Sequence, residues 1–198
     1  VTLSNNTVTV LDGASGYGIY GATIGSNVTG TVTMEGNRVF VKGGDYNTAA
    51  GALASILTVY QNTPILKDNH VVIDGGSFKW GIDPISGAGG RVEAQSDAST
   101  VTGNSLTIND GTFGKKSKFY GAWLTNSRGT SVNDNSVFIK GGTFNDHSAY
   151  FNTIAGGRAV RSGSGGETDT FTASNNVVDL DNVTLVSPRI YGGYIGNL

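Results

Sequence analysis

The sequence contains no cysteine, 3 prolines and only 14% charged residues, and each shortage excludes a class of protein. Without cysteine the chain can form neither a disulfide framework nor a thiolate zinc site. The 15 acidic and 13 basic residues leave a net charge of −2, which argues against a nucleic-acid-binding protein. No run of about 18 apolar residues is present, so no segment is expected to cross a membrane as a helix.

Small polar residues take the place of the missing charges. The chain has 31 glycines, and Gly, Thr, Asn and Ser together make up nearly half of it. These residues are poor in helix interiors, whereas Thr suits strands and Gly and Asn suit tight turns. With 37% hydrophobic residues the chain can still bury a core, so disorder is not expected. We therefore expect an all-β protein with one domain over residues 1–198.

A repeat organises this composition. The pattern N-x-Φ-x-Φ-x-[GD]-G, with Φ aliphatic, occurs in five good copies and one degenerate copy, starting at Asn6, Asn37, Asn69, Asn104, Asn135 and Asn176. Nine residues after the Asn comes a further hydrophobic residue in five copies: Tyr46, Phe78, Phe113, Phe144 and Leu185. A weaker element follows in four copies: Ile19-Tyr-Gly-Ala, Phe119-Tyr-Gly-Ala, Ile154-Ala-Gly-Gly and Ile190-Tyr-Gly-Gly.

The alternating stretch of each repeat predicts a strand with one aliphatic face. In the third copy, for example, Val71 and Ile73 share one face and Val72 points the other way. One such strand in roughly 31 residues cannot bury its face alone, so the copies are expected to stack in parallel and in register. The repeat therefore predicts a parallel β-solenoid of about six coils, with an aromatic column inside and glycines of positive φ at the corners.

The recurring Asn has its own explanation. An Asn at one corner of each coil can adopt the left-handed conformation, and its amide can bond to the Asn of the coils above and below. We expect Asn6, Asn37, Asn69, Asn104, Asn135 and Asn176 to form a structural ladder. Glycan attachment explains them less well, because most of them lack the Asn-x-Ser/Thr sequon.

Three stretches interrupt the frame and are interpreted as insertions: residues 47–66, 81–103 and 156–174. Binding residues commonly lie on loops of a rigid scaffold, so local function is expected there. The last copy stops partway through a repeat, which favours a segment of a longer repeat protein.

Large apolar residues on the outward face suggest a contact surface. Phe40, Val72 and Phe138 stand where Thr would suffice, and Tyr120 and Trp123 complete the candidate binding surface, with Tyr20, Trp80 and Tyr191 as further aromatic candidates. The alternative is that residues 47–66 fold over Phe40 and Val72 and make that column structural.

Catalytic and metal-binding patterns are weak. His70 and His147 are expected to face solvent. Asp74 and Asp110 occupy neighbouring corners, but Lys42, Asn109 and Lys140 share that column, which indicates alternating surface charge rather than a carboxylate cluster. No metal site, cofactor or catalytic residue is predicted.

The stretch from Asn135 to Phe144, Asn-x-Val-x-Ile-x-Gly-Gly-Thr-Phe, together with Ile190-Tyr-Gly-Gly-Tyr, resembles the repeats of large autotransporter passengers from Gram-negative bacteria. The resemblance implies a right-handed β-helix displayed at the bacterial cell surface, with roles in adhesion, aggregation or biofilm formation. It carries over no catalytic residue. The absence of cysteine fits a passenger that crosses an outer membrane unfolded.

The expected function is thus a non-enzymatic, extracellular adhesin segment. Its partners would be a surface glycan or protein, with no nucleic acid and with membrane attachment only through a separate anchor domain. Two alternatives stay open: a β-helix enzyme or tailspike-like binder acting on polysaccharide, and a stalk or self-associating fibre subunit.

Overall fold

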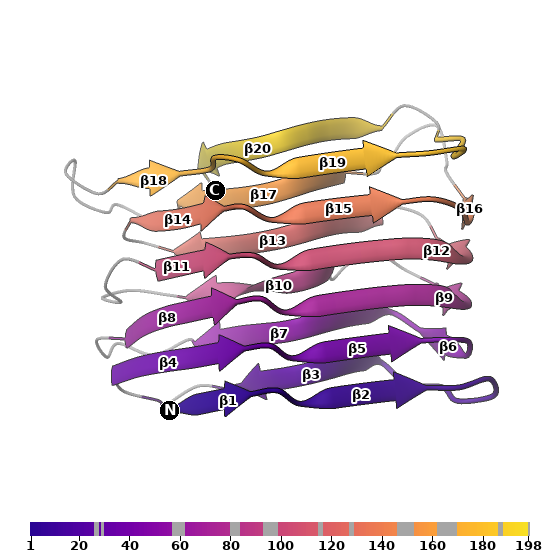
Figure 1. Ribbon diagram of the computed structural model, residues 1–198, viewed down its shortest axis with the longest axis horizontal. Coiled ribbons are helices and arrows are strands. Elements are labelled where there is room, and N and C mark those ends of the chain that lie inside the picture. The colour runs from indigo at the N-terminus through magenta and orange to yellow at the C-terminus, as the bar shows by residue number, and fades with distance from the viewer. Residues whose placement is uncertain are drawn as a thin grey trace.

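The chain forms a parallel β-solenoid in which each coil contributes one strand to each of three sheets (Figure 1). This computed structural model describes residues 1–25, 28, 30–56, 62–79, 84–92, 99–114, 117–126, 129–145, 153–161, 170–185 and 188–197. Within these residues every assigned element is a strand, and every strand pair is parallel. The all-β, parallel-solenoid prediction is confirmed.

The three sheets each hold six strands along the main ladder. Sheet A consists of β1 (Thr2–Ser4), β4 (Gly30–Glu35), β8 (Asn62–Lys67), β11 (Ser99–Thr102), β14 (Thr130–Asn133) and β18 (Phe171–Thr172). Sheet B consists of β2 (Thr7–Val10), β5 (Arg38–Val41), β9 (His70–Phe78), β12 (Ser105–Phe113), β15 (Ser136–Ile139) and β19 (Val177–Leu180), with the short strands β6 (Asp45–Tyr46) and β16 (Thr143–Phe144). Sheet C consists of β3 (Gly18–Ile24), β7 (Thr48–Ile56), β10 (Ile85–Val92), β13 (Lys118–Asn126), β17 (Thr153–Arg161) and β20 (Arg189–Asn197).

The coils are flattened into two layers. Figure 1 shows sheets A and B side by side in the front layer and sheet C behind them. Front strands run left to right and rear strands right to left as the chain climbs from the N-terminus, which is a right-handed winding. In each sheet four strands have a neighbour on both sides, and the first and last strands have one.

The inward side chains form two separate hydrophobic clusters. The larger lies between sheets B and C and contains the aliphatic pairs of the repeat, of which Val39, Val41, Val71, Ile73, Leu106, Ile108, Val137 and Ile139 are completely buried. The smaller lies between sheets A and C and includes Met34, Leu66 and Leu124. The alternation of the repeat therefore identified the inward face of sheet B correctly.

The aromatic column stands inside the larger cluster. The Phe113 ring stacks on Phe78 at 5.4 Å and on Phe144 at 5.0 Å between centroids, with interplanar angles of 12° and 14°. Tyr46 continues the column at 6.1 Å from Phe78. Phe119 from sheet C meets Phe113 and Phe144 edge-on, at 5.2 and 5.5 Å. Both offset-stacked and edge-to-face pairs are favourable aromatic geometries, so the predicted column is confirmed.

The three ranges interpreted as insertions are largely regular coil. Residues 47–66 include β7 and most of β8, residues 81–103 include β10 and β11, and residues 156–174 include most of β17 and all of β18. They looked irregular because the strands of sheet C are rich in Gly and Ala and lack the alternation of sheet B. The connecting residues 57–61, 93–98 and 162–169 lie outside the described residues.

The left-handed corner also differs from the prediction. The ladder asparagines do not have positive φ; the residue before each of them does, with φ between 52° and 68° at Asn5, Gly36, Asp68, Gly103, Asp134 and Asn175. Asn, Asp and Gly are the residues that tolerate this conformation best, which explains why only these three types occur there. The second corner is as predicted, with positive φ at Gly13, Gly44, Gly76, Gly111 and Gly142.

Candidate functional surface

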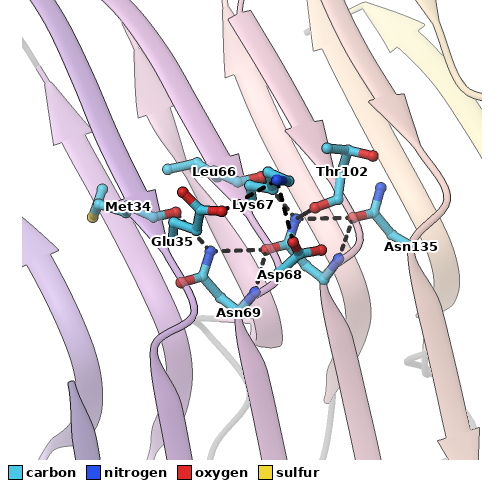
Figure 2. Close-up of polar contacts among 9 residues, drawn as sticks. Met34, Glu35, Leu66, Lys67, Asp68, Asn69, Thr102 and Asn135 are labelled. Atoms are coloured by element: carbon cyan, nitrogen blue, oxygen red, sulfur yellow. Dashed lines mark hydrogen bonds and ion pairs between the residues drawn. The ribbon is translucent and has the colours of Figure 1, made fainter. Parts of the chain in front are cut away.

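The asparagine ladder runs between sheets A and B through all six coils. Each side-chain amide donates to the Oδ1 of the next ladder Asn, over 2.7 to 3.1 Å. The same Oδ1 also accepts the backbone N–H of the preceding ladder Asn. Figure 2 shows Asn69 and Asn135 linked by dashed lines to the asparagine between them, Asn104.

The ladder amides also bond to the preceding coil. Asn69 Nδ2 donates to the carbonyl of Met34 at 2.9 Å, and Asn104 Nδ2 donates to that of Leu66 at 3.0 Å. Asn37, Asn69, Asn104 and Asn135 are completely buried, so these bonds satisfy polar groups that have no access to water. The hydrogen bonds predicted between the six asparagines are thus present in the structure.

A column of glycines in sheet C faces the ladder corner. It consists of Gly21, Gly51, Gly87, Gly121, Gly156 and Gly192, stacked in register. A Cβ on Gly121 would lie 2.6 Å from both the N and O of Ser136, the residue after a ladder Asn. Only glycine lets the two layers approach this closely, and the approach divides the core into its two clusters.

The glycine column completes the weaker sequence element. A hydrophobic residue stands two positions before every glycine of the column, so the element occurs in all six coils rather than four. The two missed copies, Ala49-Ala-Gly-Ala and Ile85-Ser-Gly-Ala, lie inside the ranges interpreted as insertions. Aligning the six segments on this glycine makes both copies visible in the sequence itself.

The predicted outward residues fall on two opposite faces. Phe40, Val72 and Phe138 lie on the outer face of sheet B, all half-buried, in the register Phe40–Val72–Thr107–Phe138. The described parts of 47–66 belong to sheets C and A, so they do not form a flap over this column. Tyr120 and Trp123 belong to β13 in sheet C, behind the core in Figure 1, so the five residues do not form one surface. Trp80 lies outside the described residues.

The outer face of sheet C carries a cluster of aromatic residues and one arginine. We define the sheet C cluster as Tyr120 and Trp123 of β13, Arg158 of β17, and Tyr191 and Tyr194 of β20. Tyr120, Ala155 and Tyr191 are register partners, as are Trp123, Arg158 and Tyr194. The cluster therefore spans three neighbouring coils.

Arg158 lies at the centre of this cluster. Its guanidinium carbon is 5.7 Å from the centroid of the Tyr120 ring and 5.4 Å from that of Tyr194. Tyr191 packs on Tyr194 at 5.1 Å, with the rings tilted by 55°. Tyr120 is only 2% exposed, whereas Arg158, Tyr191 and Tyr194 are half-buried. Sequence reasoning identified Tyr120, Trp123 and Tyr191 but missed Tyr194, and it missed Arg158 because that residue lay in a supposed loop.

The environment of Tyr120 follows from this packing. Burial raises the pKa of its hydroxyl, the Arg158 charge opposes that effect, and Tyr194 and Tyr191 add to it. Trp123 lies over Gly89 of the preceding coil, where a Cβ would collide with the indole ring. Tyr120 thus forms the floor of the cluster, and Trp123 flanks it on the same strand, β13.

The two carboxylates of the predicted corner column lie on neighbouring coils. Asp74 and Asp110 are register partners, but Asn109 donates its amide to Asp74 Oδ1 at 2.7 Å, and Asp110 accepts the N–H of Gly111. Each carboxylate thus has a neutral donor beside it. Among the described residues no group of three or more His, Asp or Glu side chains gathers in a way that could bind a metal.

His70 differs from its predicted position in solvent. The ring is half-buried, and its Nδ1 lies 2.7 Å from Ser105 Oγ of the next coil. Burial lowers the pKa of His70, the nearby Arg38 charge lowers it further, and Asp68 opposes both effects. His147 lies outside the described residues.

Exposed ion pairs join neighbouring coils at the margins. Lys67 Nζ lies 3.1 Å from Glu35 Oε1 and 3.6 Å from Asp68 Oδ2 (Figure 2). Lys79 Nζ lies 2.9 Å from Asp45 Oδ2, and this hydrogen bond and charge hold the pKa of Asp45 below its usual value. Such exposed pairs add little stability, but they give Lys67 and Lys79 anionic neighbours.

One hollow is not a candidate binding site. It is lined by Leu180, Val183, Leu185 and Ile190 and is the solvent-open end of the larger core cluster at the last coil. No helix within the described residues is long and apolar enough to cross a membrane.

No protein-family model matches the sequence, and neither the curated proteins nor the solved structures contain a significant match to it.

Proposed function

We propose that the chain is a non-catalytic segment of a secreted or surface-displayed β-helical adhesin, acting in cell adhesion, aggregation or biofilm formation. The observation that carries this proposal is the sheet C cluster, an aromatic and cationic surface on a rigid parallel solenoid. Aromatic and arginine side chains are the types enriched at recognition surfaces. The likeness of the repeats to autotransporter passengers, and the lack of cysteine, support an extracellular setting.

The rigid solenoid is suited to holding the sheet C cluster in a fixed arrangement for a binding partner. Parallel stacking positions Tyr120, Arg158 and Tyr194 on consecutive coils of one sheet, so their spacing is set by backbone hydrogen bonds rather than by loops. The buried Asn ladder and the glycine column hold the two layers together behind this sheet. A surface built this way loses little conformational freedom when a partner binds.

Adhesion of the purified chain to bacterial and host cells tests the proposal. Beads coated with the chain should bind cells, and Tyr194→Ala should weaken binding several-fold while Phe40→Thr, on the opposite face, should not. Equal adhesion by coated and bare beads would contradict the adhesin proposal. Adhesion lost in Phe40→Thr but kept in Tyr194→Ala would move the binding surface to sheet B.

A polysaccharide-cleaving enzyme is the second candidate, and one observation favours it: Asp74 and Asp110 lie side by side on neighbouring coils. Paired carboxylates are the groups that glycoside hydrolysis requires. Turnover of a polysaccharide that is abolished by Asp74→Asn and by Asp110→Asn would establish this function. Turnover that survives both substitutions would place the catalytic site elsewhere.

A further inference from the structure

Sheet C differs in charge from the rest of the molecule. Its six strands contain no Asp or Glu, although the chain has 15 acidic residues. The same strands contain five basic residues: Arg91, Lys118, Arg158, Arg161 and Arg189. A protein of net charge −2 thus has one sheet in whose strands all the charged residues are basic. Strands with basic and no acidic residues favour an anionic partner over a cationic one.

Among these five basic residues, Arg158 is the one whose guanidinium packs over two tyrosine rings. In the described part of the chain its guanidinium contacts the Tyr120 and Tyr194 rings and forms no ion pair with a carboxylate, whereas Lys67 has two ion pairs and Lys79 has one. Contact with ring faces orients the planar guanidinium without using its N–H donors. Those donors match the two oxygens of a carboxylate or sulfate group.

The surrounding residues favour a sugar as the carrier of that anionic group. Tyr191 and Tyr194 are half-buried rings beside Arg158, and aromatic rings offer apolar faces to a ligand while their hydroxyls can hydrogen-bond. Ala155, between Tyr120 and Tyr191 in the register, is a small side chain that leaves room for the guanidinium over Tyr120. A guanidinium that can bind an anionic group, with tyrosine rings beside it that can pack against a sugar ring, fits an acidic sugar.

We propose that Arg158, Tyr191 and Tyr194 form a subsite for the anionic group and ring of an acidic oligosaccharide. This inference rests on the adhesin function proposed above and names its ligand class. Tyr120 acts as a positioning residue, because it is buried beneath Arg158 and holds the guanidinium through its ring. A nucleic acid, which also carries anions and rings, is less well matched, because the chain as a whole is acidic.

Calorimetric titration of the 198-residue chain with four probes tests this subsite. The probes are a polygalacturonate oligomer bearing carboxylates, a heparin-derived hexasaccharide bearing sulfates and carboxylates, neutral cellohexaose, and a single-stranded DNA 12-mer. We expect binding of at least one acidic oligosaccharide, at least tenfold weaker with Arg158→Gln and weaker in high salt. The two acidic probes distinguish a carboxylate ligand from a sulfate ligand.

The matched control is Arg38→Gln, which removes one positive charge from the exposed outer face of sheet B. It should change affinity less than twofold. Arg158→Lys keeps the charge but loses the planar fork, so it should bind more weakly than wild type while folding normally by circular dichroism. Equal losses in Arg158→Gln and Arg38→Gln, equal binding of cellohexaose, or tighter binding of the DNA would each overturn the inference.

The outcome also separates this inference from the adhesin proposal. If wild-type and Arg158→Gln beads adhere to cells equally, the subsite is wrong and the adhesin proposal stands. If wild type neither adheres to cells nor binds any probe, the adhesin proposal itself fails.

Discussion

Asn104 donates its side-chain amide to Asn135 Oδ1 over 2.9 Å, and both side chains are completely buried. The same amide bonds to the carbonyls of Leu66 and Thr102, and Asn104 Oδ1 accepts two bonds from Asn69. One side chain therefore serves three coils at once. Such a network specifies which residues may stand at this corner, because any unsatisfied member would be costly.

The first prediction concerns this ladder. Asn104→Ala should lower the free energy of unfolding by about 3–5 kcal/mol, because it leaves several buried donors and acceptors without partners. Asn6→Ala is the matched control, since Asn6 is exposed and belongs to the first coil; its effect should stay below about 1.5 kcal/mol. Urea unfolding followed by circular dichroism measures both. Equal effects would show that burial of the ladder does not govern its contribution.

The second prediction concerns the glycine column. Gly121→Ala should destabilise the chain by about 1–3 kcal/mol, because the new Cβ would meet backbone atoms of Gly156 and Ser136 at 2.5 to 2.6 Å. Gly25→Ala should have almost no effect, because a Cβ there meets nothing within 4 Å. Thermal unfolding of the two variants gives the comparison. A Gly121→Ala variant as stable as wild type would mean that the layers can separate at no cost.

The third prediction concerns the left-handed corner. Asp134 has φ of 57° and is exposed, and Gly36 and Gly103 occupy the same position in other coils. Asp134→Gly should therefore change stability by less than about 1 kcal/mol, whereas Asp134→Val should cost about 1–2 kcal/mol. Denaturant midpoints of the pair test this order. The reverse order would contradict a conformational origin for the Asn, Asp and Gly preference.

The fourth prediction concerns pH. The folded protein holds the pKa of His70 below its usual value of 6.5, so the unfolded chain binds the proton more readily. Its contribution to stability is fully present above about pH 6.5 and is lost as the pH falls toward the lowered pKa. The melting temperature should thus drop between about pH 7.5 and about pH 5.5, and His70→Gln should reduce that drop. An NMR titration giving His70 a pKa above 6.5 would contradict the sign.

How far the sequence predicted the fold differs from sheet to sheet. In sheet B the alternation at Val71 and Ile73 identified the strand, its inward face and its register, because one buried face imposes a period of two. In sheets A and C the strands are short or rich in Gly and Ala, so Ala49 and Ile85 were interpreted as parts of insertions. The hydrophobic residues that pack against Ala49 and Ile85 belong to other coils, so no pattern in the neighbouring sequence reveals these contacts.

The candidate surface was predicted only in part. Tyr120 and Trp123 were chosen because aromatic residues on an outward face are unusual, and the structure places both on the outer side of sheet C. Phe40 and Phe138 were grouped with them, yet they lie on the opposite layer. Sequence spacing cannot tell which of two sheets an outward residue belongs to once the number of residues between strands varies from coil to coil.

By itself the sequence determined the stacking unit: a recurring Asn, an alternating strand and a glycine corner, repeated often enough that parallel coils are the arrangement that buries every aliphatic face. Only the tertiary structure decided what lies opposite what. It set the glycine column against the asparagine ladder, moved the left-handed residue one position before the Asn, and brought Arg158 between Tyr120 and Tyr194. The physical reason is that repetition along the chain encodes contacts between equivalent positions, whereas contacts between different positions depend on where each coil turns.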